Sequence, residues 1–236
     1  YGHDGTQPGR VLRFLGIVAR GGWEAMEPVC ALRYYLFAEG TFQPGQEPAL
    51  FRHLGAFEGI DVYQNTRAFP MAFLVGAIRA VEDPEATLSA MCEPGYDPAA
   101  EVVTESPPRG PLPNAQTRNL GTATITKRTS TTTTIDVEAT TDCVLVLSET
   151  FFRGWQVTID DRPSEVFPAY YALRGVVVPA GRHVVEYRFY PFSFRLGLFI
   201  STLTLLAGSL GAVYTLYTNR KRKMSLADAR KRTALP

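Results

Sequence analysis

Residues 196–217 read LGLFISTLTLLAGSLGAVYTLY, a stretch of 22 residues without a charged side chain. An α-helix rises about 1.5 Å per residue, so this stretch would be about 33 Å long, enough to cross a hydrocarbon core of about 30 Å. The alternative is the core helix of a soluble protein, but a long uncharged stretch that ends in a basic cluster is a poor match to that. The sequence therefore predicts one transmembrane helix, which we place at residues 192–219.

Basic residues flank the apolar stretch at both ends. Arg195 precedes it, and the run RKRK at residues 220–223 closes its other end. Because clusters of Lys and Arg are retained on the cytoplasmic side of membranes, we expect residues 220–236 to be a basic cytoplasmic tail and residues 1–195 to be extracytoplasmic. Nucleic acid is not an expected partner, because the basic run follows a membrane span and lacks interleaved aromatic residues.

The sequence before this helix has the period-two pattern of β-strands. Trp155, Val157 and Ile159 alternate with polar residues, and residues 175–178 are a short apolar strand followed by a Pro-Ala-Gly turn. Several such strands at roughly ten-residue spacing are typical of an antiparallel β-sandwich. We predict a mainly β fold with a jelly-roll-like sandwich at residues 120–191.

The first half of the chain predicts a small extracytoplasmic α+β segment, residues 1–105. Residues 83–85 read Asp-Pro-Glu, which is the expected order of a capping residue, a first-turn proline and a first-turn acid at the start of a helix. In residues 23–38 we expect a helix that is short or broken, because a proline lies near the middle. Residues 106–119 contain four prolines and predict a linker between the two halves.

Neither a metal site nor a catalytic residue is expected in this chain. The three histidines form no ligand-like cluster, and no GxSxG, HExxH or glycine-rich phosphate loop occurs. The acid pairs at 82–83 and 160–161 occupy cap and turn positions, where carboxylates have structural roles. Cys30, Cys92 and Cys143 leave two alternatives open: one disulfide with a thiol left over, or three buried thiols.

Aromatic and basic side chains concentrate around the tryptophan strand, and five of them are candidates for contact with a ligand: Arg153, Trp155, Tyr170, Tyr171 and Arg174. Aromatic faces stack on sugar rings, and arginine binds phosphate through two hydrogen bonds. The alternative is structural: the tryptophan belongs to a core face, and the tyrosines cap the sandwich or touch the bilayer.

Three stretches together resemble the C-terminal part of YfhO-type bacterial membrane proteins, over roughly residues 30–217. They are residues 32–35 (LRYY) with 61–65 (DVYQN) and 68–75 (AFPMAFLV), residues 151–160 (FFRGWQVTID), and residues 174–187 (RGVVVPAGRHVVEY). The turn after the tryptophan strand departs from the family, which usually has Asp-Gly where this sequence has Asp160-Asp161. A position that favours a positive φ is then filled by aspartate.

The resemblance implies a parent protein of the bacterial plasma membrane with many transmembrane helices, similar in architecture to GT-C glycosyltransferases. Such enzymes take sugars from polyprenyl-phosphate carriers on the outer face of the membrane, and YfhO-type proteins are associated with sugar decoration of the cell envelope. The catalytic acid of that architecture lies in the first extracytoplasmic loop. The chain begins at Tyr1 without a signal peptide, so we expect a non-catalytic fragment whose partners are the bilayer, upstream helices and an envelope glycan.

Two other functions fit the same sequence. The chain could be a single-span surface protein whose sandwich binds a glycan or a protein, or its parent could move lipid-linked sugars across the membrane without transferring them. Small residues four apart in the span, Gly197 with Ser201 and Gly208 with Ala212, favour a helix that packs against other helices.

Overall fold

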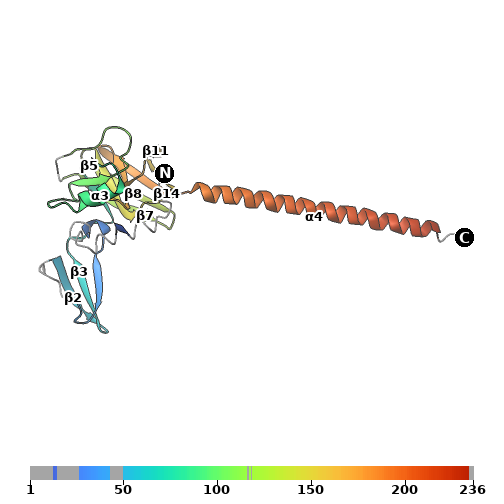
Figure 1. Ribbon diagram of the computed structural model, residues 1–236, viewed down its shortest axis with the longest axis horizontal. Coiled ribbons are helices and arrows are strands. Elements are labelled where there is room, and N and C mark those ends of the chain that lie inside the picture. The colour runs from blue at the N-terminus through green and yellow to red at the C-terminus, as the bar shows by residue number, and fades with distance from the viewer. Residues whose placement is uncertain (1–12, 15–26, 43–49, 116, 118, 234–236) are drawn as a thin grey trace. The chain divides into compact units, whose positions relative to one another are not determined.

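The computed structural model describes residues 13–14, 27–42, 50–115, 117 and 119–233. The chain forms two compact units, residues 1–189 and 190–236 (Figure 1). Most regular structure described in the first unit is β-strand, and the second unit contains the helix α4, Phe192–Thr233. The predicted mainly β fold is confirmed.

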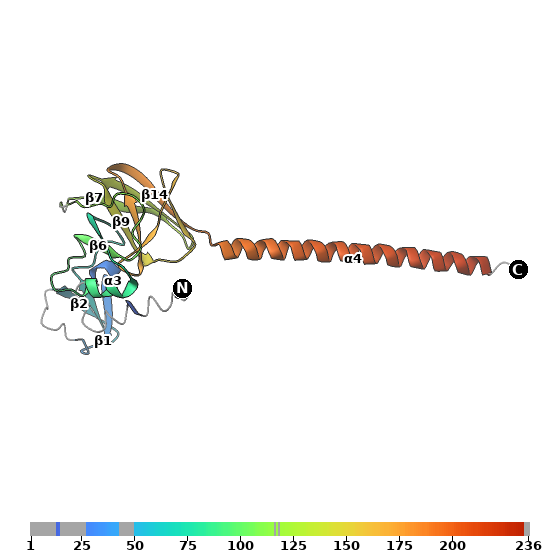
Figure 2. The same ribbon diagram turned by 45° about the horizontal axis from the view of Figure 1, so that its top comes forward.

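Two antiparallel sheets form the sandwich (Figure 2). The first has the order β11-β10-β14-β8-β7, with strands Arg162–Ser164, Trp155–Ile159, Gly181–Phe189, Thr132–Ala139 and Gly121–Arg128. The second has the order β12-β13-β9-β4, with strands Phe167–Ala169, Leu173–Val178, Cys143–Thr150 and Ala72–Val75. Buried residues of both sheets, among them Ile135, Leu145, Val176 and Val185, form one apolar core.

A second apolar core covers the other face of the β9-containing sheet. Val144 and Val146 of β9 pack there with Leu88 and Met91, and with Val102 of β6 (Glu101–Thr104). Strand β9 is therefore buried on both faces, which explains why its sequence CVLVL is continuously apolar rather than alternating.

The helix of this second core begins where the sequence predicts. Helix α3 spans Pro84–Met91, and the Asp83 side chain accepts a hydrogen bond of 2.7 Å from the Ala86 amide. The amides of the first helical turn have no partner within the helix. The capping carboxylate accepts a hydrogen bond from one of them, and proline at the first helical position has no amide to satisfy. Beside the helix, β5 (Ala77–Ala80) pairs with β6 in parallel.

The Pro-rich segment was predicted to be a linker between two halves. In the structure it does not separate two independent halves. Strand β4 precedes this segment, yet it hydrogen-bonds to β9 inside the sandwich. The Ala115 amide donates to the Gly76 carbonyl at 2.8 Å. A Cβ at Gly76 would lie 2.5 Å from the Ala115 carbonyl oxygen, so glycine permits this close approach. Residues on both sides of the segment therefore build one compact unit.

A three-stranded antiparallel sheet has the order β1-β3-β2, with strands Tyr34–Ala38, Ile60–Asn65 and Phe51–Phe57. The broken helix predicted over residues 23–38 is therefore wrong from Tyr34 onward; Pro28–Cys30 form a short 3-10 helix, η2, and residues 23–26 lie outside the described residues. Aromatic rings stack on one face of the sheet, with the Phe37 and Phe42 centroids 4.1 Å apart.

The cysteines form no disulfide, because Cys30, Cys92 and Cys143 are all free thiols. Cys143 is buried and Cys92 is exposed, so the alternative of three buried thiols holds only in part. Burial raises the pKa of the Cys143 thiol to about 11. The described residues contain no group of three metal-ligating side chains.

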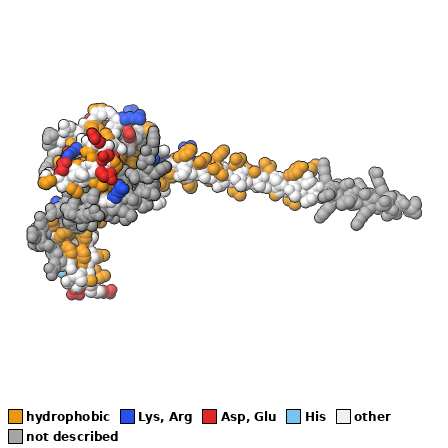
Figure 3. Space-filling model, in the orientation of Figure 1, with side chains coloured by type: hydrophobic (Ala, Val, Ile, Leu, Met, Phe, Trp, Pro, Cys, Tyr) orange, Lys and Arg blue, Asp and Glu red, His pale blue; other side chains and the backbone are white. Residues whose placement is uncertain are grey.

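Helix α4 is long and apolar enough between Phe192 and Arg220 to cross a membrane, and apolar side chains lie along it in Figure 3. Four hydroxyl groups within this part, those of Thr202, Thr204, Ser209 and Thr215, each donate to the carbonyl four residues earlier. Polar groups that find partners inside their own helix suit a hydrocarbon environment, where water is absent.

Candidate functional site

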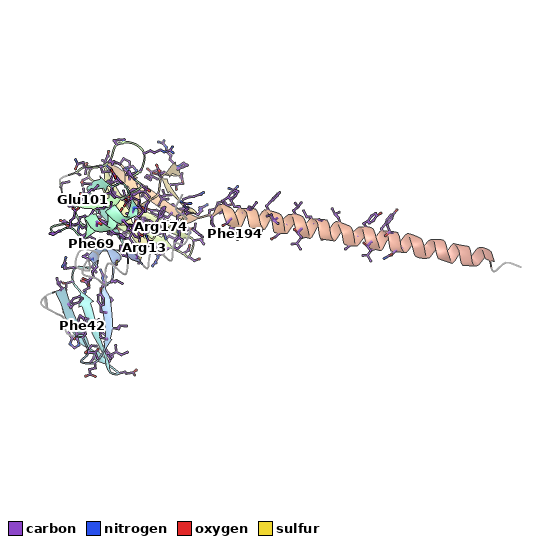
Figure 4. All side chains as sticks on the ribbon, viewed as in Figure 1. Arg13, Phe42, Phe69, Glu101, Arg174 and Phe194 are labelled. Atoms are coloured by element: carbon purple, nitrogen blue, oxygen red, sulfur yellow. The ribbon has the colours of Figure 1, made fainter. Side chains whose placement is uncertain are left out.

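A buried arginine lies at one end of the sandwich (labelled in Figure 4). Arg174 is on the same face of β13 as Val176 and Val178, which belong to the core between the two sheets. Arg174 is only 4% exposed to solvent. Arginine is almost never buried to this degree unless it is paired, so its contacts define the site.

The guanidinium has two described polar contacts on β9. Its Nε donates to the Thr150 carbonyl at 3.0 Å, and Nη2 lies 2.9 Å from Glu149 Oε2. The other carboxylate oxygen of Glu149 accepts from Arg128 Nε at 2.8 Å. One carboxylate is therefore shared between two guanidinium groups.

A register shift places Glu149 at this end. Leu173 pairs with Thr150, whereas Arg174 pairs with Leu147, so β9 has two extra residues between these pairs. Such a bulge disrupts the ladder locally and redirects a side chain, and bulges are frequent beside functional sites.

Aromatic rings cover the guanidinium. The Trp155 ring centroid lies 3.5 Å from Arg174 Cζ, and the Tyr187 centroid lies 6.0 Å from it. The face of Trp155 therefore stacks on the cation, which is a favourable cation–π contact. Trp155 also contacts Phe189, with centroids 5.1 Å apart, and it is only partly buried.

Two polar atoms of this cluster have no hydrogen-bond partner in the described part of the chain. They are Arg174 Nη1 and the hydroxyl of Tyr187, both buried. Loss of hydration lowers the pKa of Arg174 from its ordinary value, and the charge of Glu149 opposes that change. Burial likewise raises the pKa of Tyr187, which stays a neutral donor at physiological pH. The cluster therefore offers unused donors and an excess of positive charge.

The structure brings some of the predicted contact residues together. Trp155 and Arg174 form the stacked pair, and Arg153, which is exposed, lies two residues before Trp155 and forms an isolated backbone bridge with it. Contact of these residues with a ligand stays a prediction.

The two tyrosines among the predicted contact residues lie elsewhere. Tyr170 and Tyr171 are 0% and 2% exposed and belong to the second core, with α3 and β6. The Tyr170 hydroxyl donates to the Pro98 carbonyl, and its amide donates to the Val103 carbonyl at 3.0 Å. Packing against α3 and β6 buries both tyrosines away from any surface ligand, so for them the alternative of a structural role fits.

Sequence reasoning missed three members of the cluster, Arg128, Glu149 and Tyr187. A signal existed for two of them. Glu149 lies two residues after Leu147, so the alternation of the strand places it on the same inward face as Leu145 and Leu147. Tyr187 likewise lies two residues after Val185, on the inward face of its strand. An acid on the inward face of one strand and a phenol on that of another indicate a polar partner inside the sandwich.

A β-rich domain followed by one helix of membrane-spanning length is an architecture typical of membrane proteins. Residues 114–201 match the family model described as "Bacterial membrane protein YfhO". The match covers the sandwich from β7 to β14 and the first turns of α4, so this part of the chain is similar to YfhO-type bacterial membrane proteins. The match supports the predicted resemblance to YfhO-type proteins over residues 114–201. It does not test the resemblance at residues 30–113. No curated protein and no solved structure matches the chain.

Proposed function

We propose that this chain is the C-terminal accessory domain and last transmembrane helix of a glycosyltransferase that uses lipid-linked sugars in the cell envelope. The observation that carries the proposal is the YfhO match across the sandwich and the start of α4. In this proposal the donor is a polyprenyl-phosphate sugar, and the catalytic acid lies in a part of the parent protein that precedes residue 1.

Structural roles for the paired acids support an accessory domain. Asp160 accepts a hydrogen bond of 2.9 Å from the Val184 amide and lies 2.7 Å from His183 Nδ1. Asp161 follows it in the same exposed turn. A catalytic carboxylate faces its substrate in a site that excludes water, whereas Asp160 uses its oxygens to hold the turn.

The surface of α4 supports neighbouring helices. A Cβ at Gly197, Gly208 or Gly211 would meet no atom of the described residues within 4 Å. Small residues allow the backbones of two membrane helices to approach closely. We therefore propose that α4 packs against helices of the same parent protein, with the sandwich on the extracytoplasmic side and the basic end of the chain in the cytoplasm.

The test uses the full reading frame in membrane vesicles, with transfer of labelled sugar from a polyprenyl-phosphate donor to envelope acceptors as the measurement. We expect transfer by the full-length protein, reduced transfer after deletion of residues 120–190, and normal turnover for Asp160→Asn and Asp161→Asn. Loss of turnover by either aspartate variant, with folding intact, would place the chemistry in this domain. Absence of transfer by the full-length protein would reject the transferase.

An upstream reading frame with one signal peptide and no further spans would favour the alternative, a single-span surface protein that binds a glycan or a protein. Sidedness has its own test. A cysteine at exposed Arg182, introduced after removal of the three native thiols, should react with a membrane-impermeant maleimide in intact cells. Reaction only after cell lysis would reverse the proposed topology.

A further inference from the structure

We propose that Arg174 and Tyr187 form the floor of an oxyanion-binding site at this end of the sandwich, that its ligand is a phosphate group, and that Trp155 covers the site in the unliganded protein. The choice of phosphate rests on the proposed function. The binding of an oxyanion rests on the cluster itself, defined as Arg128, Glu149, Trp155, Arg174 and Tyr187.

The first argument is hydrogen bonding. A guanidinium has five N–H donors in a fixed planar arrangement. Nε and Nη2 of Arg174 have partners on β9, but Nη1 has none among the described residues, and neither has the Tyr187 hydroxyl. Buried donors without acceptors cost free energy, so this arrangement favours binding of an acceptor that the described part of the chain does not supply.

The second argument is the net charge of the cluster, which favours an anionic ligand. Two guanidinium groups, those of Arg128 and Arg174, share the single carboxylate of Glu149. The cluster therefore has one positive charge in excess, and its buried member is Arg174. Glu149 pairs with the buried Arg174, and the half-exposed Arg128 carries the excess charge, which solvent screens only in part; this charge attracts an oxyanion and not a neutral molecule.

The third argument concerns access. The partly buried Trp155 stacks on the guanidinium, and the residue before it, Gly154, has φ 111°, a conformation that residues with a side chain rarely adopt. Glycine there permits a sharp approach of the chain to β10. Movement of the Trp155 ring would let an anion reach the edge of the guanidinium, where Nη1 donates charged hydrogen bonds in the plane of the group.

The experiment follows Trp155 fluorescence in the full chain, purified in detergent. The protein has two tryptophans, so a Trp23→Phe background leaves Trp155 as the only reporter. The probes are inorganic phosphate, a short-chain polyprenyl monophosphate and sodium acetate at matched ionic strength. We expect a saturable change with both phosphates and a much weaker response to acetate.

Tyr187→Phe is the decisive variant, because it removes only an oxygen that has no hydrogen-bond partner among the described residues and therefore should leave folding intact. If the hydroxyl binds phosphate, its loss should weaken binding roughly tenfold. The matched control is Arg182→Gln, which removes an exposed arginine on the same strand that pairs with Glu138. Thermal unfolding of each variant verifies the fold.

Weaker phosphate binding by Tyr187→Phe, with normal binding by Arg182→Gln, would support the site. Tighter binding of the polyprenyl phosphate than of inorganic phosphate would assign the ligand to a lipid carrier, and equal binding would assign it to a soluble phosphate. An unsaturable response, or equal affinity in Tyr187→Phe, would overturn the site, and equal binding of acetate would overturn the assignment of phosphate. Saturable phosphate binding without sugar transfer would reject the proposed function but support this site.

Discussion

Two turns of the sandwich share an unusual backbone and have opposite surroundings. Asp160 and Asp161 have φ 49° and 64° between β10 and β11, and Tyr170 and Tyr171 have φ 47° and 68° between β12 and β13. Positive φ is uncommon for residues other than glycine and is an outlier for bulky ones, at a cost of order 1–3 kcal/mol each. The aspartates are exposed, whereas the tyrosines are buried.

Different interactions hold the two turns. The Asp160 carboxylate binds the Val184 amide and His183, so local polar contacts on neighbouring β14 fix the first turn. The second turn is fixed by tertiary packing, since Tyr170 contacts Phe73, with ring centroids 6.4 Å apart, and binds Pro98 through its hydroxyl. The same strained backbone is therefore stabilised once by hydrogen bonds at the surface and once by burial of aromatic rings.

The largest expected effect comes from emptying the buried turn. Tyr170→Ala should lower the free energy of unfolding by about 3–5 kcal/mol, because it leaves a ring-sized cavity. Tyr170→Phe keeps the ring and removes the bond to Pro98, so it should cost only about 1 kcal/mol. Denaturant unfolding in detergent measures both. Equal losses from the two variants would show that the hydroxyl, rather than ring burial, holds the turn.

Alkaline pH should weaken the tyrosine turn specifically. Burial raises the pKa of Tyr170 well above its ordinary value. A phenol with a raised pKa in the folded state contributes stability that is present below the unfolded pKa of about 10 and is lost as pH rises above it. Wild-type stability should therefore fall more steeply above about pH 10 than that of Tyr170→Phe. Parallel curves for the two proteins would contradict a buried, neutral Tyr170.

The sequence revealed the turns unequally. Aspartate tolerates positive φ better than most residues, and the departure from Asp-Gly at Asp160-Asp161 already pointed to a position that favours it; the structure confirms this with positive φ at both residues. Nothing local marks Tyr170-Tyr171 as strained or buried, because packing against α3 and β6, far away in sequence, determines both properties.

The same distinction explains the rest of the fold and the site. The α3 start and the alternating strand of Trp155 follow local rules, and both were predicted. The pairing of β4 with β9 across the Pro-rich segment is non-local, and so is the contact of Arg174 with Glu149 at a bulge. Single-sequence patterns place residues on faces, but they do not say which strands become neighbours.

Acid should weaken the aspartate turn. The bond to His183, and then the Val184 amide, hold the pKa of Asp160 below its ordinary value. A carboxylate with a lowered pKa contributes stability that is present above the unfolded pKa of about 4 and is lost as pH falls through the folded pKa. Asp160→Ala should therefore lower the melting temperature at pH 7, by less than Tyr170→Ala does, and the difference from wild type should shrink below about pH 4. A constant difference across this range would show that the carboxylate charge plays no part.

The smallest effect should come from relieving strain without touching a contact. Asp161 is exposed with φ 64° and makes no described hydrogen bond through its side chain. Asp161→Gly introduces a residue that adopts this backbone conformation without strain. The relief of strain exceeds the entropic cost of a more flexible unfolded chain, so the free energy of unfolding should rise by about 0.5–1 kcal/mol. Tyr171→Gly relieves the same strain but removes a buried ring, so it should destabilise instead. Opposite signs for the two substitutions, measured by denaturant unfolding, would establish that surroundings rather than backbone distinguish the turns; equal signs would reject that distinction.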